Sequence, residues 1–157
     1  MFFQNFRRNM KVPCTLQQFP LDELRRLFLA GKTHDIPLTW FDEQIKPTVG
    51  IDVYGTPFPA DGIAQYTRGN TRMLVMRSEL DDREKARVVA DFVGLPGFVL
   101  TNTNISAQKE YGEANRAFRK DVRLPAEYVD KMCNSKYFNH FYSREAVAAV
   151  RQKWLAT

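Results

Sequence analysis

The sequence predicts an α/β fold in which helices pack on a parallel sheet, and three neighbouring features carry this prediction. Met73–Met76 is a continuous apolar run, typical of an interior parallel strand that is covered on both faces. An acidic turn follows, and residues 81–93 then show the apolar spacing of a helix that ends at Gly94. A strand, a turn and a helix in this order favour layered α/β packing over a β-sandwich.

Two short helices are predicted nearer the start of the chain. Leu21–Leu29 has helical apolar spacing, and Gly31 follows it as a stop. A second helix is predicted over residues 38–45, and it should end before Pro47 because proline interrupts the hydrogen bonding of a helix. This helix contains the adjacent acids Asp42 and Glu43. Adjacent helical side chains point in different directions, so the preference of helix starts for negative charge explains these acids as well as a catalytic pair does.

Three strands are predicted in the middle of the chain. Apolar and polar residues alternate over residues 50–55, between flanking glycines, and residues 63–67 are predicted as a second strand. Gly69-Asn70 is a turn signal that predicts a hairpin into residues 72–77. Glu79 follows at the carboxyl end of this last strand, where open α/β sheets usually place ligands.

The clearest amphipathic helix is predicted over residues 106–120. Its basic face carries Lys109, Arg116 and Lys120. A solvated charged face is the ordinary explanation. The functional alternative is an anion site at the start of this helix, built from Asn104, Ser106 and backbone N–H groups.

Residues 124–154 predict two helices joined by an aromatic elbow. Pro125 suits a first helical turn, and Ser143 suits the N-cap of the last helix. Either this segment only caps the core, or its polar groups also contact a ligand. The groups concerned include Lys136 and His140, and the last helix carries an apolar stripe of Val147, Val150 and Trp154.

Composition limits the class of protein. The chain has 157 residues, a net charge of +5 and an isoelectric point near 9.3, which fits one domain over residues 1–157 that favours anionic partners. Nucleic acid is not favoured, because the sequence has no zinc-finger spacing or aromatic-glycine RNA-binding motif. Cys14, Cys133, His34 and His140 form no metal-ligand spacing. The two cysteines suggest a reducing compartment, although a disulfide between them stays open.

The chain has no apolar run of membrane-spanning length, and its start lacks the apolar region of a signal peptide. We therefore expect a cytoplasmic protein.

Several segments together resemble one known family. Asn134–Tyr137, His140–Ser143 and Lys153-Trp154 are similar to the C-terminal signature of the capsular polysaccharide synthesis proteins, a family that itself resembles the P-loop sulfotransferases. The central block and an Asn-x-x-x-x-Lys-x-Tyr segment of that family are matched by Trp40–Pro47, Gly50–Tyr54 and Asn104–Tyr111. Residues 72–77 with Glu79-Leu80 are similar to a sulfotransferase strand and the turn after it, without the usual Asp in that turn.

The resemblance implies a P-loop-type, three-layer parallel sheet flanked by helices. It also implies transfer of sulfate from 3′-phosphoadenosine-5′-phosphosulfate (PAPS) to a carbohydrate hydroxyl. It places Ser106, Lys109, Tyr111 and Lys136 at the cofactor, and makes Asp42, Glu43 and His140 candidates for the catalytic base, with no metal.

The sequence departs from the sulfotransferase pattern in one important respect. It has no Gly-rich phosphate loop with Lys and Ser/Thr, so the chain resembles a sulfotransferase domain that is incomplete at its N-terminus. We expect it to bind PAPS weakly alone, and a second copy or further N-terminal residues to complete the sheet. The alternatives are a non-catalytic binding or assembly module of the polysaccharide synthesis machinery, and a transferase that uses another anionic donor.

Overall fold

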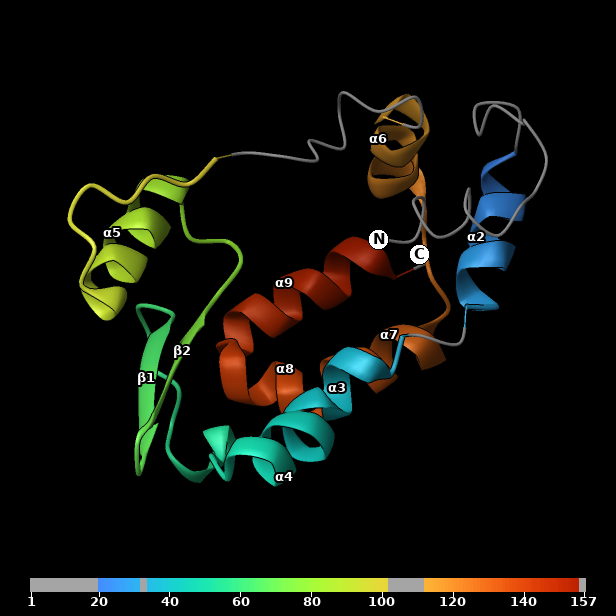
Figure 1. The fold of residues 1–157 in the computed structure, drawn as a ribbon. Helices are drawn as coiled ribbons and strands as arrows, with labels where there is room; N and C mark the ends of the chain where they lie inside the picture. The colour runs from blue at the N-terminus through green and yellow to red at the C-terminus, as the bar shows by residue number, and fades with distance from the viewer. Residues whose placement is uncertain (1–19, 32–33, 102–111, 156–157) are drawn as a thin grey trace, which may run out of the picture.

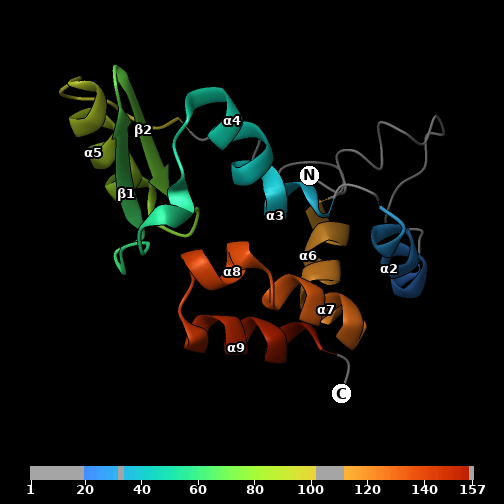
Figure 2. The same cartoon turned by 90° about the horizontal axis from the view of Figure 1, so that it is seen from below.

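The computed structural model describes residues 20–31, 34–101 and 112–155 (Figures 1 and 2). A β-hairpin with helix α5 lies at one end of the molecule, and helices α2 and α6 lie at the other. The segments between them are α3 to α4 and α7 to α9. The helices are α2 (Leu21–Leu29), α3 (Ile36–Trp40), α4 (Lys46–Val49), α5 (Asp82–Val93), α6 (Gly112–Asp121), α7 (Ala126–Cys133), α8 (Lys136–Phe141) and α9 (Arg144–Trp154), and the strands are β1 (Ile63–Arg68) and β2 (Thr71–Met76).

Helix α2 has the predicted bounds, whereas the second predicted helix runs further at both ends. Helical backbone continues from Ile36 through a π-helical turn at Phe41–Ile45 and on to Val49. The Lys46 N–H bonds to the Phe41 carbonyl, five residues back. The prediction that the helix ends before Pro47 is therefore wrong. A π-turn widens the helix, and we attribute the tolerance of Pro47, which has no N–H to donate, to this local widening.

Residues 50–55, predicted as a strand, begin with Gly50 in the left-handed conformation that ends α4 and lead through the extended Asp52 into a 3₁₀ turn at Val53–Gly55. The alternation does correspond to burial, because Ile51 and Val53 are buried while Asp52 is exposed. The turn is fixed by the Asp52 side chain, which accepts a hydrogen bond of 3.0 Å from the Tyr54 N–H. A buried, alternating segment thus needs no partner strand here.

The predicted hairpin is confirmed. β1 and β2 pair antiparallel from Ile63 opposite Met76 to Arg68 opposite Thr71. In the part of the chain that the structure describes, β1 is the strand beside β2, and the side chains of Met73–Met76 are half-buried. The three-layer parallel sheet stays a prediction.

Helix α5 follows β2 as predicted, with the Asp81 side chain accepting from the Glu84 N–H at 2.8 Å and Gly94 at φ 71° ending it. Its buried residue is Val88, whereas Val93, its last residue, is 50% exposed.

The C-terminal segment contains three helices where two were predicted. The aromatic elbow is itself helix α8, whose N-cap Ser135 accepts a hydrogen bond of 3.2 Å from the Phe138 N–H. Ser143 caps α9 as predicted, accepting from the Ala146 N–H at 3.2 Å. Figure 2 shows α8 and α9 running side by side, and α8 contacts α3, α7 and α9.

In the residues that the structure describes, two apolar clusters form the core. The first joins α2, α6, α7 and α9, and the predicted α9 stripe packs against it. The second joins residues 51–53 to α8. Cys133 is a buried free thiol of the first cluster, while Cys14 lies outside the described residues. Within the described ranges, no helix combines the length and apolar character that crossing a membrane requires.

Candidate functional site

Three of the predicted site residues, Asp42, Lys136 and His140, converge around Tyr54. The Lys136 ammonium lies 3.0 and 2.8 Å from the two Asp42 carboxylate oxygens and 3.9 Å from the centroid of the Tyr54 ring. The His140 ring packs edge-on against Tyr54, with ring centroids 4.8 Å apart. We name these four residues the Tyr54 cluster.

Local structure brings these side chains together. Lys136 and His140 lie four residues apart on α8 and so share a face of that helix. Asp42 comes from the π-turn that precedes α4. Tyr54 is held by the Asp52 turn, and Asp52 in turn pairs with Lys46, Nζ to Oδ2 2.6 Å.

The surroundings of His140 favour the neutral form of its imidazole. Burial lowers the pKa of its imidazole, and the Lys136 charge lowers it further, against the opposing effect of a hydrogen bond to the Val53 carbonyl. Its Nε2 atom is buried and has no hydrogen-bond partner among the residues described. A neutral imidazole carries one N–H and one free lone pair, so this shielded nitrogen can either donate or accept a hydrogen bond.

Tyr54 contributes a second shielded polar atom. Burial raises the pKa of its hydroxyl to about 12, with smaller contributions from Asp42, Tyr137 and Asp52, so the hydroxyl keeps its proton at neutral pH. Within the described ranges this oxygen has no hydrogen-bond partner either. Buried polar atoms are normally hydrogen-bonded, and a pair of exceptions on two touching rings marks this position as chemically unusual.

Aromatic side chains surround the cluster. Phe41 packs on Tyr54 and Phe141, and Phe58 packs on His140 and Phe141, with centroid distances between 4.7 and 6.1 Å. These rings belong to the second apolar cluster. They supply the low-dielectric surroundings that lower the pKa of His140.

The carboxyl end of β2, where the sequence predicts ligands, is contacted by Tyr142. Its hydroxyl donates a hydrogen bond of 2.9 Å to Glu79 Oε1. Burial and the Glu79 charge raise the pKa of Tyr142 well above its ordinary range. This contact ties the hairpin end of the molecule to the C-cap of α8.

The remaining predicted site residues are less informative. Glu43 is exposed on the π-turn. Ser106, Lys109 and Tyr111, predicted at the cofactor, lie outside the described residues. In the described part of the chain, no group of three or more His, Cys, Asp or Glu side chains could hold a metal ion.

Sequence reasoning missed Tyr54 and its supports Asp52 and Lys46. The available signal was Asp52-x-Tyr54, because an Asp side chain often accepts from the N–H two residues later and so forms a turn. The strand interpretation of residues 50–55 hid this signal.

A comparison with protein-family models identifies the family of this chain. Residues 20–143 match the model described as "Putative capsular polysaccharide synthesis protein". The chain belongs to this family. All four residues of the Tyr54 cluster lie inside the matched range. A search of curated proteins and a search of solved structures each returned no match.

Proposed function

We propose that this member of the capsular polysaccharide synthesis family transfers sulfate from PAPS to a carbohydrate hydroxyl. The supporting observation is the shielded Nε2 atom, without a hydrogen-bond partner among the described residues, of a histidine whose pKa is lowered by burial and by the Lys136 ammonium. Sulfate transfer requires a base for the attacking hydroxyl and positive charge at the transferring group. The Tyr54 cluster holds both kinds of group.

In this proposal His140 is the base. The sugar oxygen attacks sulfur, the bond from sulfur to the bridging phosphate oxygen breaks, and the hydroxyl proton passes to His140 Nε2. Adenosine 3′,5′-bisphosphate leaves with the electron pair of the broken bond. Lys136 stabilises the negative charge on the group being transferred.

Asp42 and Glu43 fit the role of base less well. Both Asp42 oxygens accept hydrogen bonds from Lys136, so this carboxylate orients the ammonium. Glu43 is exposed and is not a member of the Tyr54 cluster. We assign Asp42 a positioning role and propose that Glu43 contacts the acceptor sugar.

Access to His140 requires movement. The Nε2 atom and the Tyr54 oxygen are shielded from solvent, so a sugar hydroxyl reaches them only after a neighbouring side chain shifts. Phe58, whose ring centroid lies 6.1 Å from that of His140, belongs to the Pro-containing loop before β1 and is the neighbour we propose to move.

In this proposal PAPS binds at Lys136. Ser106, Lys109 and Tyr111 remain the proposed contacts with its nucleotide part. Lys136 fits an anionic donor because its side chain is 56% exposed while its ammonium is already oriented. A P-loop-type sheet remains part of this proposal.

The second candidate is a non-catalytic assembly module. The sequence lacks a Gly-rich phosphate loop, and large apolar side chains such as Ile36, Trp40 and Val99 are exposed. Exposed apolar residues of this size are common at protein–protein interfaces.

A sulfate-transfer assay separates the two candidates. Labelled PAPS is incubated with the chain and a panel of polysaccharides, and sulfated product is measured. His140→Gln should lower the rate about 10²-fold or more, the usual contribution of a general base, with its circular dichroism unchanged. His34→Gln is the matched control, since His34 bonds to Tyr128 and the Phe28 carbonyl away from the cluster.

Transfer that survives His140→Gln at the wild-type rate would contradict the role of base. Absence of transfer from the wild-type chain to every acceptor would favour the assembly module.

A further inference from the structure

We infer that a cavity between α2, α6, α7 and α9 binds a small anionic amphiphile, a molecule with an apolar body and one negatively charged end. The cavity measures about 400 Å³, which lies in the range of small-molecule pockets. Asp42, Glu43, Lys136 and His140 do not line it. The inference is therefore independent of the proposed sulfate transfer.

The lining is apolar over most of its area. Ten of the twelve lining residues are apolar or aromatic, among them Phe28, Phe118, Phe138 and Trp154, and the polar members are Asn115 and Arg119. The Tyr128 hydroxyl is already used, because it bonds to His34 Nδ1 at 2.8 Å. A sugar or nucleotide placed here would leave most of its polar groups unpaired, which is unfavourable.

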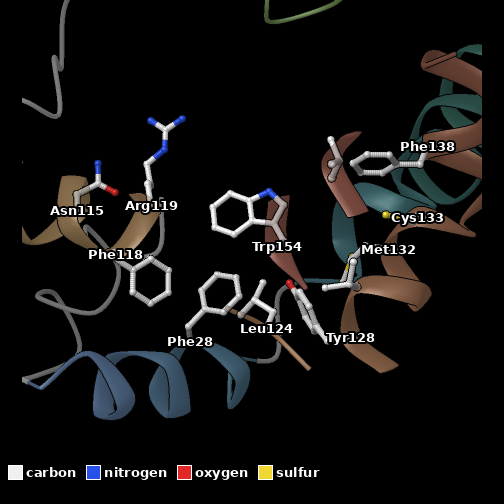
Figure 3. Close-up of a pocket in the computed structure, with 12 residues that line it drawn as sticks. Phe28, Asn115, Phe118, Arg119, Leu124, Tyr128, Met132, Cys133, Phe138 and Trp154 are labelled. Carbon is white, nitrogen blue, oxygen red and sulfur yellow. The ribbon is translucent and has the colours of Figure 1, made fainter. Parts of the chain in front are cut away.

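The two polar side chains sit together at one end. Asn115 and Arg119 lie four residues apart on α6, and Figure 3 shows both on the same side of the cavity, with Phe138 and Cys133 at the opposite end. Arg119 is exposed, and it forms no hydrogen bond or ion pair with any residue in the described ranges. A guanidinium binds carboxylate or phosphate through paired hydrogen bonds. The charged end of the ligand therefore belongs at Arg119.

The apolar body then extends past Trp154 toward Phe138 (Figure 3). The cavity is open to solvent, so part of its apolar lining is exposed to water. A hydrocarbon chain would bury this surface without needing hydrogen bonds, and burial of apolar surface is favourable. An unbranched anionic amphiphile therefore matches both the cationic end and the apolar end of the cavity.

Tryptophan fluorescence provides the test. The chain has two tryptophans, Trp40 and Trp154, so Trp40→Phe leaves the cavity residue as the reporter. Sodium dodecanoate, kept below its micelle concentration, should change the emission saturably, and dodecanol serves as the neutral probe. Arg119→Ala should weaken dodecanoate binding about tenfold or more through loss of a charge-assisted hydrogen bond, with dodecanol binding unchanged. Arg116→Ala, an exposed position on the same helix, is the matched control.

A second variant tests the location. Val150→Trp fills the cavity and should abolish dodecanoate binding while the circular dichroism stays native. Calorimetry on the unmodified chain repeats the affinity measurement without Trp40→Phe. The inference is overturned by absence of saturable binding, by equal weakening in Arg119→Ala and Arg116→Ala, or by binding that survives in folded Val150→Trp.

Discussion

His140 owes its proposed chemistry to its surroundings. Its Nε2 atom is buried among aromatic rings without a hydrogen-bond partner in the described residues, and burial lowers the pKa of the imidazole. An exposed histidine would be partly protonated near neutral pH. The same burial gives the residue a measurable effect on stability.

The free energy of unfolding should depend on pH through His140. Its folded pKa is lowered from the ordinary value of 6.5, so below that pH the unfolded chain binds the proton more readily than the fold does. The stabilisation is therefore complete above pH 6.5 and is lost as the pH falls toward the lowered pKa.

Urea denaturation between about pH 7.5 and about pH 5 measures this effect. The wild-type chain should lose stability more steeply than His140→Gln, which cannot titrate at this position. Parallel slopes for the two proteins would show that His140 is not buried as described.

The sequence identified most of the Tyr54 cluster, although it did not identify its centre. Asp42, Lys136 and His140 were predicted because each stands beside aromatic residues or within the family signature. Tyr54 was missed because its neighbours are set by tertiary packing. Asp42 and Lys136 are 94 positions apart, and no local rule reports that their ion pair forms over a ring from a third segment.

At the scale of elements, α8 is central because it carries Lys136 and His140 on one face and Phe141 in the second apolar cluster. It has six residues, too few to be stable alone, so its cap and its packing hold it. The sequence predicted the cap of α9 and missed that of α8, since so short a helix shows no clear apolar period.

Removing the caps should destabilise the fold. Ser135→Ala and Ser143→Ala should each lower the free energy of unfolding by about 1 kcal/mol, because one backbone N–H loses its partner. Urea denaturation measures both. Ser78→Ala is the matched control, an exposed serine outside any helix, and it should change stability by less than about 0.5 kcal/mol. Equal losses at all three positions would mean that the caps contribute nothing specific.

Element prediction succeeded where signals were local and failed where they were not. The hairpin was predicted from Gly69-Asn70, and α5 from its Asp and Gly ends. The continuation of helix through Pro47 could not be predicted, because it depends on a π-turn that no sequence rule announces. The segment at residues 50–55 was mistaken for a strand since alternation alone does not identify a partner.

At the scale of the whole molecule, α8 lies between two distinct sites. Phe138 lines the apolar cavity, while Lys136 and His140 belong to the Tyr54 cluster. This short helix therefore separates an apolar cavity that has a cationic end from the Tyr54 cluster, whose polar groups are surrounded by aromatic rings. The parallel sheet that the sequence predicts cannot be derived from local patterns, because strand order depends on long-range pairing.

Calorimetric titration with adenosine 3′,5′-bisphosphate tests the central claim that the Tyr54 cluster binds the sulfate donor. Lys136→Ala is compared with Lys131→Ala, a close match because both side chains are 56% exposed and both ammonium groups lie 2.8 Å from an aspartate. We predict saturable binding, about micromolar or weaker, that Lys136→Ala weakens about tenfold and Lys131→Ala leaves unchanged. No binding to the wild-type chain, or equal weakening in both variants, would contradict the claim.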